Sequence, residues 1–75
     1  MAIYFEEVKE TVIGDGLVMW REFANGEGYQ VAIQMDGYAE EVVLETFKSY
    51  APEYDFYKSR DLFKKAIQDP YGVLF

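Results

Sequence analysis

Cysteine and histidine are both absent from the 75-residue chain. Without cysteine there is no disulfide framework, and without either residue there is no Cys/His zinc site of the kind that holds many small domains together. Nucleophilic catalysis by a Cys–His or Ser–His pair is excluded on the same ground. The fold must therefore depend on the packing of its own apolar side chains.

Long apolar runs are absent as well. No stretch approaches the roughly 20 apolar residues that a membrane-spanning helix needs, so we expect no membrane association. Residues 1–7 contain no base and no apolar run of the length found in secretory signals, so we expect no signal peptide. Together with the lack of cysteine, these features favour a cytoplasmic protein.

Basic residues are scarce, seven against fourteen acids, which gives a net charge of −7. Residues 1–57 hold twelve acids and three bases, a net charge of −9, whereas residues 58–75 hold two acids and four bases, a net charge of +2. A negative surface repels phosphate backbones, so we expect no direct binding of nucleic acid. The bases near Asp61 are better explained as helix-stabilising ion pairs.

Apolar residues are plentiful, at 51% of the chain, and aromatic residues make up 19%. Each buried aromatic side chain removes about 150–250 Å² from water, so even a chain of this length can fill one core. No internal repeat, low-complexity stretch or linker interrupts the sequence. We predict a single small acidic domain that spans residues 1–75.

Two glycine clusters in the first half, at residues 14–16 and 25–28, predict hairpin turns. After the second cluster, residues 29–35 alternate large apolar with small or polar side chains, which is typical of a strand. Residues 17–23, between the clusters, alternate less cleanly, but they are the natural hairpin partner of that strand. The opening segment, about residues 2–13, is ambiguous because its apolar residues also fit helical spacing. We favour a strand there, since the first glycine cluster makes a better hairpin turn than a helix end.

The apolar period changes to three and four after residue 36. This spacing predicts an amphipathic helix over about residues 37–50, ended by Pro52, and a second over about residues 53–68, ended by Asp69 and Pro70. The fold class that follows is α+β. We predict a three-stranded antiparallel meander (about 2–13, 17–23 and 29–35) followed by two amphipathic helices packed on one face of the sheet.

Two short helices can cover only one face of such a sheet, and its edges stay open. Trp20 lies on the predicted central strand, where a place in the core is favoured over a role as an exposed anchor. The apolar tail, residues 71–75, either packs back on the domain or docks on another molecule. The tyrosines likewise either fill the core or form an interface.

Motifs for enzyme chemistry are missing. Neither glycine cluster is followed by the Lys-Ser/Thr of a phosphate-binding loop, and no segment fits the calcium-loop pattern. Adjacent acids such as Glu6 and Glu7 could bind a cation or serve in acid–base catalysis, but close pairs arise by chance in so acidic a segment. We therefore expect no enzyme activity, no cofactor and no metal site.

Small size, acidic charge and the lack of a catalytic constellation predict a non-enzymatic protein–protein interaction module. The hypothesis is a small acidic adaptor or inhibitor that binds a basic site on a larger partner, one form being a DNA mimic that occupies a nucleic-acid enzyme's cleft. Candidate partner-binding residues lie on the exposed face of the first predicted helix and at the corner between the helices: Glu40, Glu41, Glu45, Glu53, Tyr54 and Asp55.

Two other functions stay open. The chain could be a structural subunit of an obligate complex or a homo-oligomer, joined through the uncovered sheet face or the C-terminal tail. It could also be an enzyme that uses carboxylates with a metal or small ligand, which predicts a thermal shift with divalent cations. Salt distinguishes the acidic interaction module from the structural subunit. Binding through acidic residues weakens as ionic strength rises, whereas apolar contacts between subunits do not.

Overall fold

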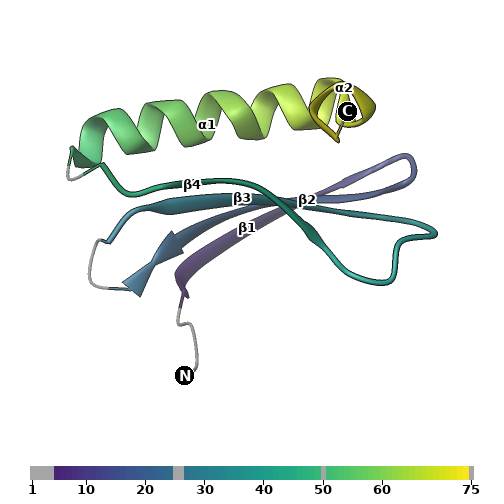
Figure 1. Ribbon diagram of the computed structural model, residues 1–75, viewed down its shortest axis with the longest axis horizontal. Helices are drawn as coiled ribbons and strands as arrows, with labels where there is room; N and C mark the ends of the chain where they lie inside the picture. Colours follow the sequence, from purple (N-terminus) through teal and green to yellow (C-terminus); the bar gives the residue numbers. More distant parts are fainter. Residues whose placement is uncertain (1–4, 25–26, 50, 75) are drawn as a thin grey trace.

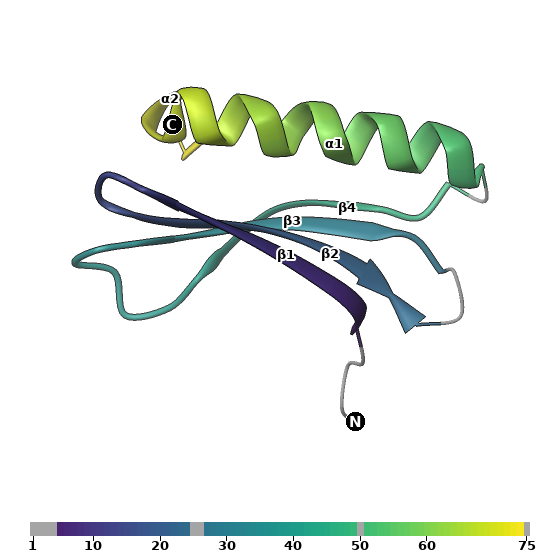
Figure 2. The ribbon, with the colours of Figure 1, turned by 180° about the vertical axis from the view of Figure 1, so that it is seen from behind.

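The computed structural model describes residues 5–24, 27–49 and 51–74. The strands form one antiparallel sheet in the order β1-β2-β3-β4, and the long helix α1 lies along one face of it, with the short α2 at its end (Figures 1 and 2). The fold is α+β, as predicted. The elements are β1 (Phe5–Ile13), β2 (Gly16–Phe23), β3 (Tyr29–Met35), β4 (Val42–Phe47), α1 (Pro52–Gln68) and α2 (Pro70–Leu74).

The sheet has four strands where three were predicted, because the predicted helix over residues 37–50 is wrong. Residues 36–41 connect two strands, and Val42–Phe47 form β4, which pairs with β3. Two physical features explain the error. The β-branched Val42, Val43 and Thr46 favour strands, and a register shift between Val31 and Ala32 interrupts the alternation of faces along β4, so its apolar spacing resembles that of a helix.

The strands predicted before residue 36 are confirmed. Residues 5–13 of the ambiguous opening segment form β1, while residues 2–4 lie outside the described residues. The first glycine cluster makes the β1–β2 turn, with Ile13 opposite Gly16. Residues 25–26 of the second cluster lie outside the described residues, but in the same β2–β3 connection the Phe23 N–H donates to the Gly28 carbonyl at 2.9 Å. Gly28 has a φ of 128°, and a Cβ there would collide with the Phe47 carbonyl, so only glycine fits.

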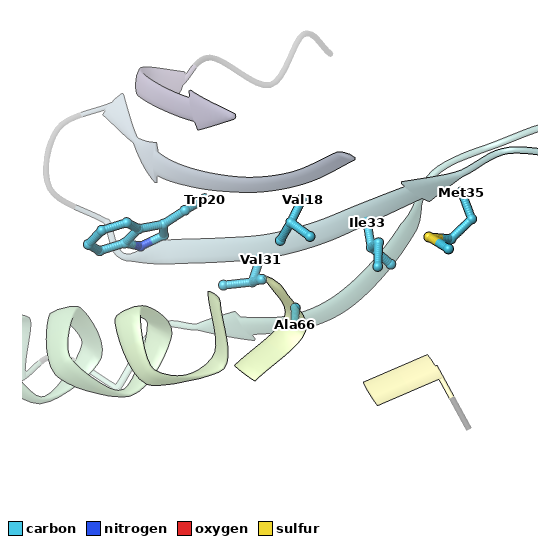
Figure 3. Packing of buried hydrophobic residues seen from close by; sticks show 6 residues of the cluster. All are labelled: Val18, Trp20, Val31, Ile33, Met35 and Ala66. Carbon is cyan, nitrogen blue, oxygen red and sulfur yellow. The ribbon is translucent and has the colours of Figure 1, made fainter. Parts of the chain in front are cut away.

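The core lies between α1 and the sheet (Figure 3). Alternate residues of β2 and β3 point toward the helix, and Val18, Val31 and Ile33 are fully buried there. Aromatic and aliphatic side chains of α1, among them Phe56, Phe63 and Ile67, pack against them. The residues that form the buried cluster are Val18, Trp20, Val31, Ile33, Met35 and Ala66.

Trp20 belongs to the core, as predicted, with 8% of its surface exposed. Its indole N–H donates to the Ser59 hydroxyl at 3.0 Å, so its one polar atom is satisfied inside the core. The tail also packs back on the domain, because Val73 and Leu74 of α2 contact the core while Tyr71 is exposed. Phe75, the last residue of the predicted tail, lies outside the described residues.

The second predicted helix is confirmed as α1, which begins with Pro52 at its first position. Ala51 precedes it and supplies no side-chain cap, so Asp55 stabilises the helix start instead. The Asp55 carboxylate accepts hydrogen bonds from the Ser49 amide at 3.1 Å and the Ser49 hydroxyl at 2.5 Å. Its backbone N–H donates to the Ala51 carbonyl at 2.9 Å. Neither helix, within the described residues, is long and apolar enough to cross a membrane.

Candidate interaction surface

The six residues predicted to bind a partner do not share one helix face. Glu40 and Glu41 lie in the connection between β3 and β4, and Glu45 lies in β4. Glu53 and Tyr54 lie in the first turn of α1 and are exposed. Asp55 follows them but is 3% exposed, and its carboxylate bonds to Ser49. Asp55 is therefore part of the helix start and not of the exposed corner that was predicted.

Glu41 is engaged within the chain by an ion pair with Arg21 of β2. Both carboxylate oxygens of Glu41 accept hydrogen bonds from the Arg21 guanidinium, a bidentate geometry that is among the stronger charge-assisted contacts. Arg21 also donates to Gln30 Oε1 at 2.9 Å and contacts the Met19 sulfur at 3.1 Å. The pair ties the connection between β3 and β4 to the sheet face that α1 leaves uncovered.

Sequence reasoning did not single out Arg21, although a signal for it was present. Arg21 alternates with Met19 and Phe23 along β2, so all three share the face opposite the helix. All three are buried, at 9%, 7% and 7% exposure. A lone base among apolar residues on one face of a central strand requires an acidic partner, because an unpaired buried charge is costly. The identity of that partner, Glu41, follows only from the tertiary structure.

A shallow groove between β4 and α1 brings together three of the six predicted residues, Glu45, Tyr54 and Asp55. Lys58 lines the same groove, and its ammonium lies 5.5 Å from the centre of the Tyr54 ring. The groove therefore carries both charges and is not uniformly acidic. Glu53 borders a separate hollow beside Tyr57.

Exposed tyrosines mark the solvent side of α1. Tyr54 and Tyr57 are 55% and 52% exposed. The guanidinium carbon of Arg60 lies 5.0 Å from the centre of the Tyr57 ring, as Lys58 lies over Tyr54, so tyrosine and base stack in pairs along the helix. Tyr29, in contrast, is half-buried beside Trp20. The tyrosines therefore divide between core and surface.

The strands and their connections carry most of the exposed acidic charge. Among described residues 8–49, seven acids are exposed, and the three bases all contact their own chain. Arg21 pairs with Glu41, the Lys9 ammonium lies 5.0 Å from the centre of the Trp20 ring, and the Lys48 ammonium lies 4.6 Å from the centre of the Phe23 ring. The exposed acids are Glu10, Asp15, Glu27, Asp36, Glu40, Glu41 and Glu45.

One of these acids is linked to the C-terminal helix. The Tyr71 hydroxyl donates to Asp15 Oδ2 at 2.8 Å, which joins α2 to the β1–β2 turn. The hydrogen bond to Asp15 and the negative charge of that carboxylate raise the pKa of Tyr71, with smaller contributions from burial, Tyr38 and Asp36. The Asp36 N–H also donates to the Asp15 carbonyl at 2.6 Å, so two connections meet at this end of the sheet.

The described residues contain no group of three or more acidic side chains placed to hold a metal ion. A cavity of about 40 Å³ lies beside Trp20 and is also lined by Lys9, Glu22 and Phe56. This volume holds a water molecule or the end of one side chain, whereas the groove between β4 and α1 and the hollow beside Tyr57 are larger and open to solvent.

No protein-family model, no curated protein and no solved structure matches this chain.

Proposed function

We propose that this chain is a non-enzymatic interaction module, a small acidic adaptor or inhibitor that binds a basic site on a larger protein. The observation that carries the proposal is the distribution of charge over the sheet and its connections. Seven exposed acids lie there among the described residues. Glu41 pairs with Arg21, and the other two bases of the region, Lys9 and Lys48, lie over aromatic rings. Most of the exposed acidic charge is therefore available for a partner.

An acidic surface of this kind mainly affects the rate of association with a partner and the choice of partner. Clustered like charges attract a basic partner from a distance and raise the association rate, and salt screens the attraction over about 8–10 Å. The proposal therefore requires that partner affinity fall steeply with ionic strength. Of the six residues predicted for this role, we retain the four exposed ones that lie outside the Arg21–Glu41 pair and the Asp55–Ser49 contact: Glu40, Glu45, Glu53 and Tyr54.

A second candidate is a structural subunit of an obligate complex or a homo-oligomer. The observation in its favour is a set of exposed valines on the uncovered sheet face: Val8 is 43%, Val12 82% and Val43 45% exposed. Burial of such side chains at about 25 cal/mol per Å² drives association without regard to salt. The net charge of −7 opposes self-association, which makes an acidic interaction module the better supported function.

The test is affinity capture of the tagged protein from its native lysate at low and high salt, read by mass spectrometry. We expect a basic protein that is retained at low salt and lost at high salt. Replacing three exposed acids together (Glu40→Gln, Glu45→Gln, Glu53→Gln) should reduce its recovery, while Asp61→Asn, the same chemistry on the basic half of α1, should not.

Salt-resistant recovery of a fixed set of proteins, unchanged in the triple variant, would contradict the proposal and favour a structural subunit. Displacement of the recovered partner by duplex DNA would favour the narrower DNA-mimic form, in which this chain occupies the cleft that binds nucleic acid.

A further inference from the structure

β1 is an edge strand of the sheet. It is the first strand in the order β1-β2-β3-β4, so its outer edge has no partner strand among the described residues. The main packing contacts of α1 with the sheet are with β2, β3 and β4. β1 is also long, at nine residues, whereas natural proteins usually keep edge strands short or covered. A row of unpaired backbone donors and acceptors is a template for another strand.

The side chains of β1 on the uncovered face form a simple pattern. Val8, Glu10 and Val12 are two residues apart, so they point to the same face, and all three are exposed. Their neighbours across the β1–β2 pairing are Arg21, Met19 and Leu17, which are buried or half-buried. The strand edge thus presents an apolar, an acidic and an apolar side chain in succession, beside a surface that is already packed.

We propose that the outer edge of β1 binds an extended segment of a basic partner, which adds to the sheet as a fifth strand. Its alternate residues place an apolar side chain, a lysine or arginine, and a second apolar side chain opposite Val8, Glu10 and Val12. This is strand addition, in which the backbone ladder supplies affinity and alternate side chains supply specificity. This inference rests on the proposed function. It adds that the basic partner places a lysine or arginine opposite Glu10.

Charge complementarity selects this occupant over a second copy of the chain. β1 contains three glutamates and one lysine, so pairing two copies edge to edge would place twice that number, six glutamates and two lysines, in neighbouring strands. Like charges on adjacent strands are destabilising. Each chain also brings a net charge of −7. A basic segment avoids both the repulsion between glutamates on adjacent strands and the repulsion between two negatively charged chains.

The opposite edge is a poorer template. β4 has six residues, and its register with β3 shifts at Val31 and Ala32. Bulges of this kind bend an edge strand and discourage further pairing. α1 also packs against β4. The two edges of one sheet thus differ, and β4 serves as an internal control.

The probe is a synthetic peptide with the core Val-Thr-Lys-Thr-Val, added to the full chain labelled with ¹⁵N. We expect saturable shifts and slowed amide exchange in β1, with β4 unchanged. A peptide with glutamate in place of the lysine should bind roughly tenfold more weakly, because attraction to Glu10 becomes repulsion. The lysine peptide with alternate backbone N-methylation keeps its side chains but cannot complete the ladder, and it should not bind.

Variants of the protein complete the design. Glu10→Lys should reverse the preference between the lysine and glutamate peptides, and Val12→Thr should weaken both. Val43→Thr is the control, since Val43 is also an exposed valine on the uncovered face, 45% against 82% for Val12, but lies near the other edge, and it should leave peptide affinity unchanged. Reversed preference with Glu10→Lys shows that the variant is folded.

The proposal is overturned if the lysine peptide leaves β1 amides unchanged, if it perturbs β4 instead, or if the N-methylated peptide binds equally well. Dimerisation through β1 in sedimentation experiments would overturn it in favour of a second copy. Salt-sensitive capture of a basic protein that persists unchanged with Glu10→Lys and Val12→Thr would leave the proposed function standing and remove only the docking site on β1.

Discussion

The two faces of the sheet are closed in different ways. On the face toward α1, Val18, Val31 and Ile33 are fully buried among aromatic and aliphatic side chains. On the opposite face, Met19, Ala32 and Phe23 are also buried. No helix among the described residues covers that face. There the Arg21–Glu41 pair and the Lys48 ammonium over Phe23 provide cover. One face is closed by hydrocarbon, and the other in part by charged side chains.

The apolar face and the partly charged face therefore have different roles, one in stability and the other in positioning. Apolar contacts are non-directional and contribute about 25 cal/mol per Å² of surface removed from water. A buried ion pair loses much of its Coulomb attraction to desolvation, yet it accepts only one geometry. We therefore expect the helix-facing side to supply most of the free energy of unfolding. The opposite side positions the β3–β4 connection, and with it the acids of the candidate surface.

The largest expected effect comes from Ile33→Ala on the helix-facing side. Ile33 is fully buried in the cluster of Figure 3, so truncation leaves a cavity and should lower the free energy of unfolding by about 2–5 kcal/mol. Val43→Ala on the opposite face should cost less than about 1 kcal/mol, because Val43 is 45% exposed. Urea denaturation followed by Trp20 fluorescence measures both, and equal losses would contradict the contrast between the faces.

Next in size is the Arg21–Glu41 pair. Glu41→Ala leaves the Arg21 guanidinium buried without its carboxylate and should cost about 1–3 kcal/mol, less than for a fully buried pair because the Glu41 side chain is 37% exposed. The double replacement Arg21→Met with Glu41→Leu should recover most of that loss. If the double replacement is as unstable as Glu41→Ala, the pair contributes stability as well as position.

A smaller loss is expected at the hydrogen bond between Trp20 and Ser59 inside the core. Ser59→Ala removes the acceptor of the Trp20 indole N–H, which is then buried without a partner, at a cost of about 1–2 kcal/mol. In the Trp20→Phe background there is no indole N–H to satisfy, so the same replacement should cost much less. Equal costs in the two backgrounds would mean that Ser59 acts through packing alone.

The smallest effect belongs to Tyr71, which is exposed. Because its folded pKa is raised, its contact with Asp15 stabilises the fold below the usual tyrosine pKa of about 10 and is lost as pH rises through the folded value. Asp15→Asn should lower the pKa of Tyr71 toward its ordinary value while leaving the free energy of unfolding at neutral pH nearly unchanged. NMR titration of the Tyr71 ring carbons measures the pKa, and an unaltered value would exclude Asp15 as the cause.

β3 and β4 show where the spacing of apolar residues predicts secondary structure in this fold and where it does not. β3 alternates without interruption from Tyr29 to Met35, so its period alone predicted a strand with the observed bounds. β4 contains a register shift, and its apolar residues recur at intervals that suit a helix, so the same method failed. The residues predicted for the candidate surface also include some whose exposure follows from their type and one whose burial does not. That Glu40, Glu45 and Glu53 are exposed agrees with their charge, whereas the burial of Asp55 depends on Ser49 and could not be read from its type.

The sequence by itself determined the features that depend on composition and on near neighbours: the excess of acids, the lack of cysteine and histidine, both hairpin turns, and the helix from Pro52 to Gln68. These follow from backbone preferences and side-chain spacing within a few residues. Only the tertiary structure decided that Val42–Phe47 is a strand, that Arg21 binds Glu41 and that β1 has an open edge. The physical reason is that pairing and burial are set by contacts between segments far apart in the chain, and such contacts override local preference.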